Sequence, residues 1–74
     1  MKAFALLNHM IRNSGKNRQE ISREINRSDN YLRVVIGKKS IPAVDMFATI
    51  ARACGYELHL IGHDEDIVID PKEN

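Results

Sequence analysis

Two short helical segments follow each other with almost nothing between them, and this succession restricts the fold more than any other feature. Asn17 stands three residues before Glu20, the spacing of a capping box at a helix start. Asn26 comes where that helix must end, because asparagine tolerates the left-handed conformation of a C-terminal cap. Ser28 then offers a second N-cap, and Gly37 a second stop. Such short helices are unstable alone, so they must pack on the rest of the chain.

Two longer helices are predicted on either side of this pair. Apolar residues recur at helical spacing over residues 2–13, before the pair. After it, a helix is predicted from Pro42, at its first position, to Gly55, its cap. The second of the short helices is expected over residues 28–36. The sequence therefore predicts a compact, mainly α domain of four helices at residues 1–55.

After the last helix the apolar period changes from helical to alternating. Residues 56–61 alternate as a strand, residues 62–66 are turn-forming, and residues 67–70 are a second β-branched run. We expect a β-hairpin at 56–70 and a frayed tail at 71–74. A two-stranded hairpin is marginal in water, so it must pack on the helices or pair with another copy. This predicts a homodimer whose dimerisation element is the hairpin, with packing around the helix at residues 42–55 as the alternative.

The small net charge of +1 hides a strong asymmetry. Residues 1–52 hold ten Lys or Arg against four Asp or Glu, a net charge of +6. Residues 53–74 hold one against six, a net charge of −5. A basic body of this kind indicates a polyanionic partner. The alternative is a solvated surface whose charges happen to segregate.

Reactive residues give no sign of catalysis. The single cysteine, Cys54, excludes an internal disulfide and indicates a reducing cytoplasm. No apolar run approaches the roughly 20 residues that span a bilayer, so no membrane partner is expected. His9, His59, His63 and Cys54 lack the spacing of a metal site. Without a Ser/His/Asp arrangement, phosphate loop or carboxylate pair, we expect no enzyme, no metal and no cofactor.

A further set of positions matches a known pattern of apolar, small, turn, cap and basic residues. These are Ile21, Ser22, Ile25, Asn26, Ser28, Leu32, Val35, Lys38, Lys39, Pro42 and the closing stretch IARACGYEL. In them the chain, from Phe4 to about Leu60, resembles the Cro/C1-type (XRE-like) helix-turn-helix family of phage repressors and small bacterial regulators. It departs from the family at Asp29, where Gln or Arg is usual, and at Gly37, one residue early. The resemblance implies a lambda-repressor-like helical domain, and the trailing strand resembles dimerisation or antitoxin members.

The resemblance also implies which residues meet the bases of DNA. In such a motif the second helix enters the major groove, and its N-terminal residues contact base edges. Asp29, Asn30, Tyr31 and Val34 occupy those positions. Asparagine suits adenine, valine the thymine methyl group, and aspartate the cytosine amino group. The alternatives are ordinary helix-start hydrogen bonding for Asp29 and Asn30, and packing against the first helix for Tyr31.

Phosphate contacts are expected around the same two helices, where they position the protein without reading sequence. The candidates are Asn17, Arg18, Ser28, Arg33, Lys38, Lys39 and Ser40. The two lysines have an alternative role as solvated loop charges. Arg23 and Arg27 are expected to pair with Glu20 and Glu24 instead.

Together these features predict a sequence-specific, dimeric DNA-binding transcriptional regulator, a repressor, whose partner is double-stranded DNA. The alternative is a protein-interaction module, such as an antitoxin whose acidic hairpin binds a toxin by strand addition.

Overall fold

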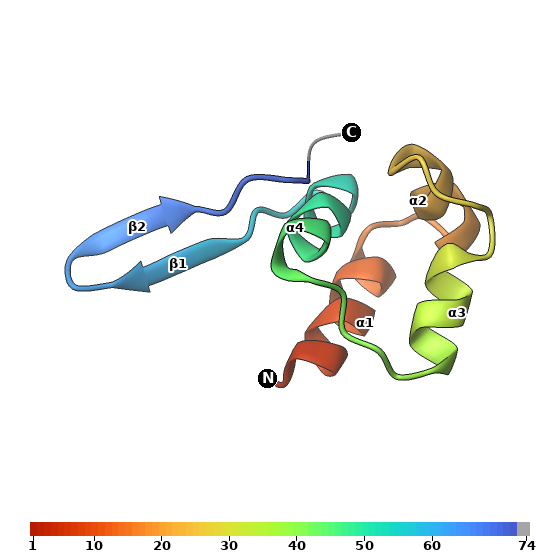
Figure 1. Ribbon diagram of the computed structural model, residues 1–74, viewed down its shortest axis with the longest axis horizontal. Helices are drawn as coiled ribbons and strands as arrows, with labels where there is room; N and C mark the ends of the chain where they lie inside the picture. The colour runs from red at the N-terminus through yellow and green to blue at the C-terminus, as the bar shows by residue number, and fades with distance from the viewer. Residues whose placement is uncertain (73–74) are drawn as a thin grey trace.

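Four helices and a C-terminal antiparallel hairpin make up the computed structural model, which describes residues 1–72 (Figure 1). The elements are α1 Ala3–Asn13, α2 Arg18–Glu24, α3 Tyr31–Gly37, α4 Val44–Ala53, β1 His59–Gly62 and β2 Glu65–Val68. The predicted mainly α fold with a C-terminal hairpin is confirmed. Figure 1 shows α3 at one end of the molecule and the hairpin projecting from the other. Among residues 1–72, no helix is long and apolar enough to cross a membrane.

One apolar core joins the four helices. Its buried members are Leu7, Met10, Ile11, Ile21, Ile25, Leu32, Met46, Phe47, Ile50, Ala51 and Cys54. From α3 only Leu32 is fully buried, while Val35 and Ile36 are half-buried against the same cluster. α3 thus rests on the core along one edge, and its opposite face is left outside.

The predicted signals at the ends of α2 are confirmed. The Glu20 N–H donates to Asn17 Oδ1 at 2.8 Å, and the Asn17 N–H donates to Glu20 Oε1 at 3.3 Å, which completes a capping box. Asn26 takes a left-handed φ of 62° directly after the helix. At the end of α4, Gly55 takes a φ of 87°. Both residues serve as left-handed caps, which asparagine tolerates and which glycine favours because it has no Cβ.

The start of α3 differs from the prediction. The helix begins at Tyr31 rather than at Ser28, and its N-cap is Asn30. The Tyr31 N–H donates to the Ser28 carbonyl in a preceding turn, and the first α-helical bond runs from the Val34 N–H to the Asn30 carbonyl. Ser28 therefore begins a turn and does not cap the helix.

The end of α3 also differs, because Gly37 lies inside the helix and does not stop it. The left-handed residue is Lys39, with a φ of 53°. Its N–H donates to the Ile36 carbonyl, and the Ser40 N–H donates to the Val35 carbonyl, both at 3.0 Å. These two bonds form a Schellman motif whose left-handed residue is Lys39. The place where the helix ends decides which residue takes this position, and here it outweighs the preference of glycine for it.

α4 begins two residues later than predicted. Its first residue is Val44 and its N-cap is Ala43, so Pro42 precedes the helix. The Phe47 N–H donates to the Ala43 carbonyl, and Asp45 Oδ1 accepts the Met46 N–H at 2.8 Å. The first turn thus obtains its cap from an internal carboxylate, and Pro42 shapes the extended segment before it.

The hairpin is tighter than the predicted one. His63 and Asp64 both take positive φ, 47° and 58°, which makes a two-residue turn of the kind that matches strand twist. Gly62 therefore pairs with Glu65, and β2 starts at a residue that the sequence placed in the turn. The prediction missed this because the turn contains no glycine, although aspartate and histidine tolerate left-handed backbone.

The hairpin is attached to the helices only at its base. Leu58, just before β1, packs on the helical core, and the Lys72 N–H, beyond β2, donates to Thr49 Oγ1 of α4 at 2.8 Å. Every residue of β1 and β2 is exposed. Of the two expectations for the hairpin, packing of its strands on the helices of the same chain is therefore not realised.

Candidate nucleic-acid interface

A buried hydroxyl fixes α3 on α2. Ser22 Oγ donates to the Arg18 carbonyl at 2.8 Å and accepts the Leu32 N–H at 3.2 Å, and the residue has no exposed surface. A buried N–H without such a partner would cost free energy comparable to a lost hydrogen bond. Ser22 and Leu32 therefore fix the position of α3 relative to α2.

The outer face of α3 consists of Asn30, Arg33, Val34 and Gly37, all exposed and spaced as one side of a helix. Val34 exposes 45% of its surface, which is unusual for a valine in a chain with so small a core. Tyr31 lies differently: it is half-buried against the core, and the Arg27 guanidinium lies 5.3 Å from its ring centroid. The structure thus brings three of the four predicted base-contacting residues, Asp29, Asn30 and Val34, to exposed positions, and turns Tyr31 inward.

A shallow groove of about 540 Å³ lies between the start of α2 and the start of α3. Its lining unites five of the predicted DNA-contacting residues with two others. The lining residues are Ile11, Asn17, Arg18, Gln19, Asp29, Asn30 and Arg33. Residues from both helices can therefore meet one ligand on this surface.

The Asp29 carboxylate already has donors within the protein. Arg23 Nε lies 2.8 Å from Oδ1 and Arg23 Nη2 lies 2.9 Å from Oδ2, while Gln19 Nε2 donates to Oδ2 at 3.0 Å. Hydrogen bonds from Arg23 and then from Gln19 hold the pKa of Asp29 well below its usual range. The carboxylate is thus ionised at neutral pH and ties the start of α3 to α2.

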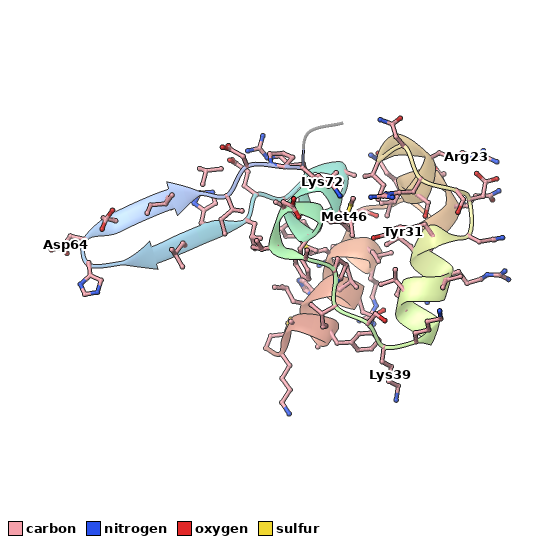
Figure 2. All side chains as sticks on the ribbon, viewed as in Figure 1. Arg23, Tyr31, Lys39, Met46, Asp64 and Lys72 are labelled. Atoms are coloured by element: carbon pink, nitrogen blue, oxygen red, sulfur yellow. The ribbon has the colours of Figure 1, made fainter. Side chains whose placement is uncertain are left out.

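This cluster corrects the expected partners of the arginines. Arg23, labelled in Figure 2, pairs with Asp29 and not with a glutamate of its own helix. Glu24 instead pairs with Lys16 at 2.9 Å. Arg27 stacks on Tyr31. Helical spacing could not reveal these pairs, because each joins an element to a neighbouring turn or helix.

The side chain of Asn30 is not used at the helix start. Although it is the N-cap residue of α3, it makes no capping hydrogen bond. Asn17, the N-cap of α2, does make one. The helix-start alternative is therefore not realised for Asn30, whose side-chain amide makes no hydrogen bond within residues 1–72.

Four exposed cations surround the outer face of α3. Arg18 lies at the start of α2, Arg33 on α3, and Lys38 and Lys39 at its end, where Figure 2 labels Lys39. Among the residues that the structure describes, none of the four takes part in an ion pair. Ser40 follows the two lysines and Ser28 precedes α3, both exposed. The acidic hairpin tip, labelled at Asp64, lies at the opposite end of the molecule.

Sequence reasoning missed Gln19 and misassigned Arg23. Gln19 stands in the first turn of α2, lines the groove and donates to Asp29. Its amide, a type suited to base or phosphate contacts, was the available signal. The link from Arg23 to Asp29 left no signal, because six residues and a turn separate them.

Two features describe the remaining reactive groups, their burial and their grouping. Burial raises the pKa of the Cys54 thiol, which disfavours the nucleophilic thiolate. Within residues 1–72, no group of three or more His, Cys, Asp or Glu side chains is placed to hold a metal ion.

Comparisons of the chain with protein-family models, with curated proteins and with solved structures found no match.

Proposed function

We propose that this chain is a cytoplasmic, sequence-specific DNA-binding transcriptional regulator, a repressor, which inserts α3 into the major groove as a homodimer. One observation carries the proposal: α3 is fixed from within by Leu32 and Ser22, yet its outer face is exposed beside cations that form no ion pair within residues 1–72. The major groove of B-DNA is wide enough to admit an α-helix. The resemblance to the Cro/C1-type family supports the same assignment.

Sequence reading is assigned to Asn30 and Val34. The unengaged Asn30 amide can form paired hydrogen bonds with adenine, and Val34 can contact a thymine methyl group. Asp29 has a different role, because its oxygens already accept from Arg23 and Gln19. It positions those two donors at the DNA-facing groove. Tyr31 positions α3 from its inner side.

Affinity is assigned to phosphate contacts on both sides of α3. Arg18 and the exposed part of Asn17 lie at one side, and Arg33 lies on the helix itself. Lys38, Lys39 and Ser40 lie at the other, with Ser28 between the two helices. Cations spread from one side of α3 to the other would bind the two DNA strands that border one major groove. Such contacts release counterions, so binding should weaken steeply with salt.

Selection from a pool of random duplexes tests the proposal. We expect recovery of a two-fold symmetric site whose half-sites are centred about 34 Å apart, one turn of DNA. An Asn30→Ala, Val34→Ala variant should recover no such site from the same pool. A failure of the unaltered chain to enrich any sequence would contradict sequence-specific binding.

The double substitution Lys38→Gln, Lys39→Gln is expected to weaken binding to all duplexes similarly. Loss of two phosphate contacts in each protomer, four per dimer, should reduce the slope of log K against log salt by about 3.6. Fluorescence anisotropy at several salt concentrations measures this slope. Lys72→Gln is a matched control, because Lys72 lies beyond α4, away from α3 (Figure 2). An unchanged slope in the double variant would place the two lysines away from phosphates.

A second function is favoured by the full exposure of both hairpin strands. An open two-stranded sheet can accept a strand from another protein, as in an antitoxin that binds a toxin. Deletion of residues 56–74 separates the two functions. Loss of dimers together with DNA binding favours the regulator, whereas retained DNA binding with loss of a copurifying protein favours the interaction module.

A further inference from the structure

An apolar groove of about 270 Å³ lies on the side of the helical domain next to the hairpin base. We call it the α1–α4 groove. Its lining is entirely apolar and comes from α1, α4 and the segments that precede and follow α4. The lining residues are Ala3, Leu6, Ile41, Pro42, Val44, Phe47 and Leu58. Ile41 and Val44 expose 49% and 60% of their surfaces, so the groove opens outward.

The hairpin carries a matching apolar face. Leu60 pairs directly with Ile67, and alternation places both side chains on one side of the sheet. They expose 62% and 47% of their surfaces. At the base of the hairpin, Leu58 packs on the helical core and the Lys72 N–H is bonded to Thr49 of α4. Figure 1 shows the hairpin projecting away from the helices of its own chain.

We propose that two copies of this chain bind each other by reciprocal exchange of these surfaces. The Leu60 and Ile67 face of one protomer lies in the α1–α4 groove of its partner, and the partner's hairpin lies in the groove of the first. A two-fold axis makes the two contacts identical and closes the dimer, so no further copy can add. The contact also gives a marginal hairpin the apolar partner that it lacks.

Charge complementarity favours a second copy over an unrelated occupant. The hairpin tip is acidic, with Asp64, Glu65 and Asp66 in succession, and residues 53–74 carry a net charge of −5. The helical part that bears the groove carries +6, and Lys2 directly precedes Ala3 at its edge. Lys2, next to the groove, is thus opposite in charge to the acidic hairpin that would lie there. Such complementarity steers association and fixes orientation.

The length of the molecule favours this arrangement over tip-to-tip pairing of hairpins. The molecule extends 39 Å along its longest axis, with α3 and the hairpin at opposite ends (Figure 1). Pairing of two hairpins at their tips would place the two α3 helices well over 39 Å apart. A hairpin laid beside the partner's helices brings the domains together, toward the roughly 34 Å between successive major grooves. In this respect the inference rests on the proposed function and deepens it.

The test measures the dimer dissociation constant by sedimentation equilibrium without DNA, so its outcome is independent of the proposed function. Leu60→Asp places a charge on the hairpin face, and Val44→Asp places one at the groove. Each alone should raise the dissociation constant at least about tenfold, because both contacts of the dimer are damaged. Ile61→Asp is the matched control, since Ile61 is exposed on the opposite face of β1 and should leave the constant unchanged.

Mixing the two defective variants gives the decisive measurement. A heterodimer of Leu60→Asp with Val44→Asp keeps one intact hairpin and one intact groove that face each other. An equimolar mixture should therefore dimerise more tightly than either variant alone, which two misfolded proteins would not do. Edge-to-edge pairing of hairpins predicts instead that Val44→Asp dimerises normally. That result would overturn the proposal, and so would a mixture that shows no recovery. An unaltered chain that stays monomeric would also overturn it, as expected of a hairpin that binds another protein instead.

Discussion

Replacement of Leu32 with alanine is expected to lower the free energy of unfolding by about 2–5 kcal/mol. Leu32 has no exposed surface and is the one fully buried side chain that α3 contributes to the core. Its truncation leaves a cavity where α3 meets the other helices. A chain of 74 residues has roughly 4–11 kcal/mol of stability in total, so the loss is a large fraction. Urea unfolding followed by circular dichroism measures it.

Val34→Ala is the matched control for this substitution. It removes carbon atoms from the same helix, but from its exposed face, so stability should change by no more than about 0.5 kcal/mol. DNA binding should respond in the opposite way: the stable Val34 variant loses preference for thymine at one position. Equal destabilisation by the two substitutions would mean that the outer face of α3 is covered, which contradicts its role as a DNA-reading face.

The contrast between these two residues was accessible from the sequence through the resemblance, which gives Leu32 and Val35 as apolar positions of the motif and Val34 as a base-facing one. In the structure Leu32 is buried, Val35 is half-buried and Val34 is exposed. The limits of α3 were not accessible. They depend on a turn at residues 28–30 and on a Schellman motif at Lys39, both of which are decided by how the helix packs on its neighbours. Local preferences of Ser28 and Gly37 are too weak to oppose that packing.

The candidate interface was predictable to a similar degree. The resemblance located the exposed polar residues near α3, because their positions follow from the pattern of apolar ones. It did not show that Asp29 is engaged by Arg23 and Gln19, since that contact joins residues of two elements. The α1–α4 groove was also hidden, because Ala3, Val44 and Leu58 come together only in the folded chain. Contacts between different helices, strands and connecting segments were therefore not predictable from the sequence.

Two asparagines at the starts of neighbouring helices give the second large effect, because the structure assigns them opposite roles. Asn17 accepts the Glu20 N–H at 2.8 Å, so Asn17→Ala should cost about 1 kcal/mol of stability. Asn30 makes no such bond, so Asn30→Ala should leave stability within about 0.5 kcal/mol. Thermal or urea unfolding of the two variants compares them directly.

DNA binding should reverse this order. A paired contact of asparagine with adenine is worth about 1–3 kcal/mol of discrimination, roughly 5- to 150-fold in relative affinity. Asn30→Ala should therefore remove the preference at one position of each half-site, while the other positions keep theirs. Asn17→Ala should weaken binding to every duplex alike, if at all, because Asn17 lies at the phosphate side of the groove. Competition binding with single-position duplex variants separates the two patterns. A uniform loss in the Asn30 variant would make it a phosphate contact, and destabilisation equal to that of the Asn17 variant would make it a cap.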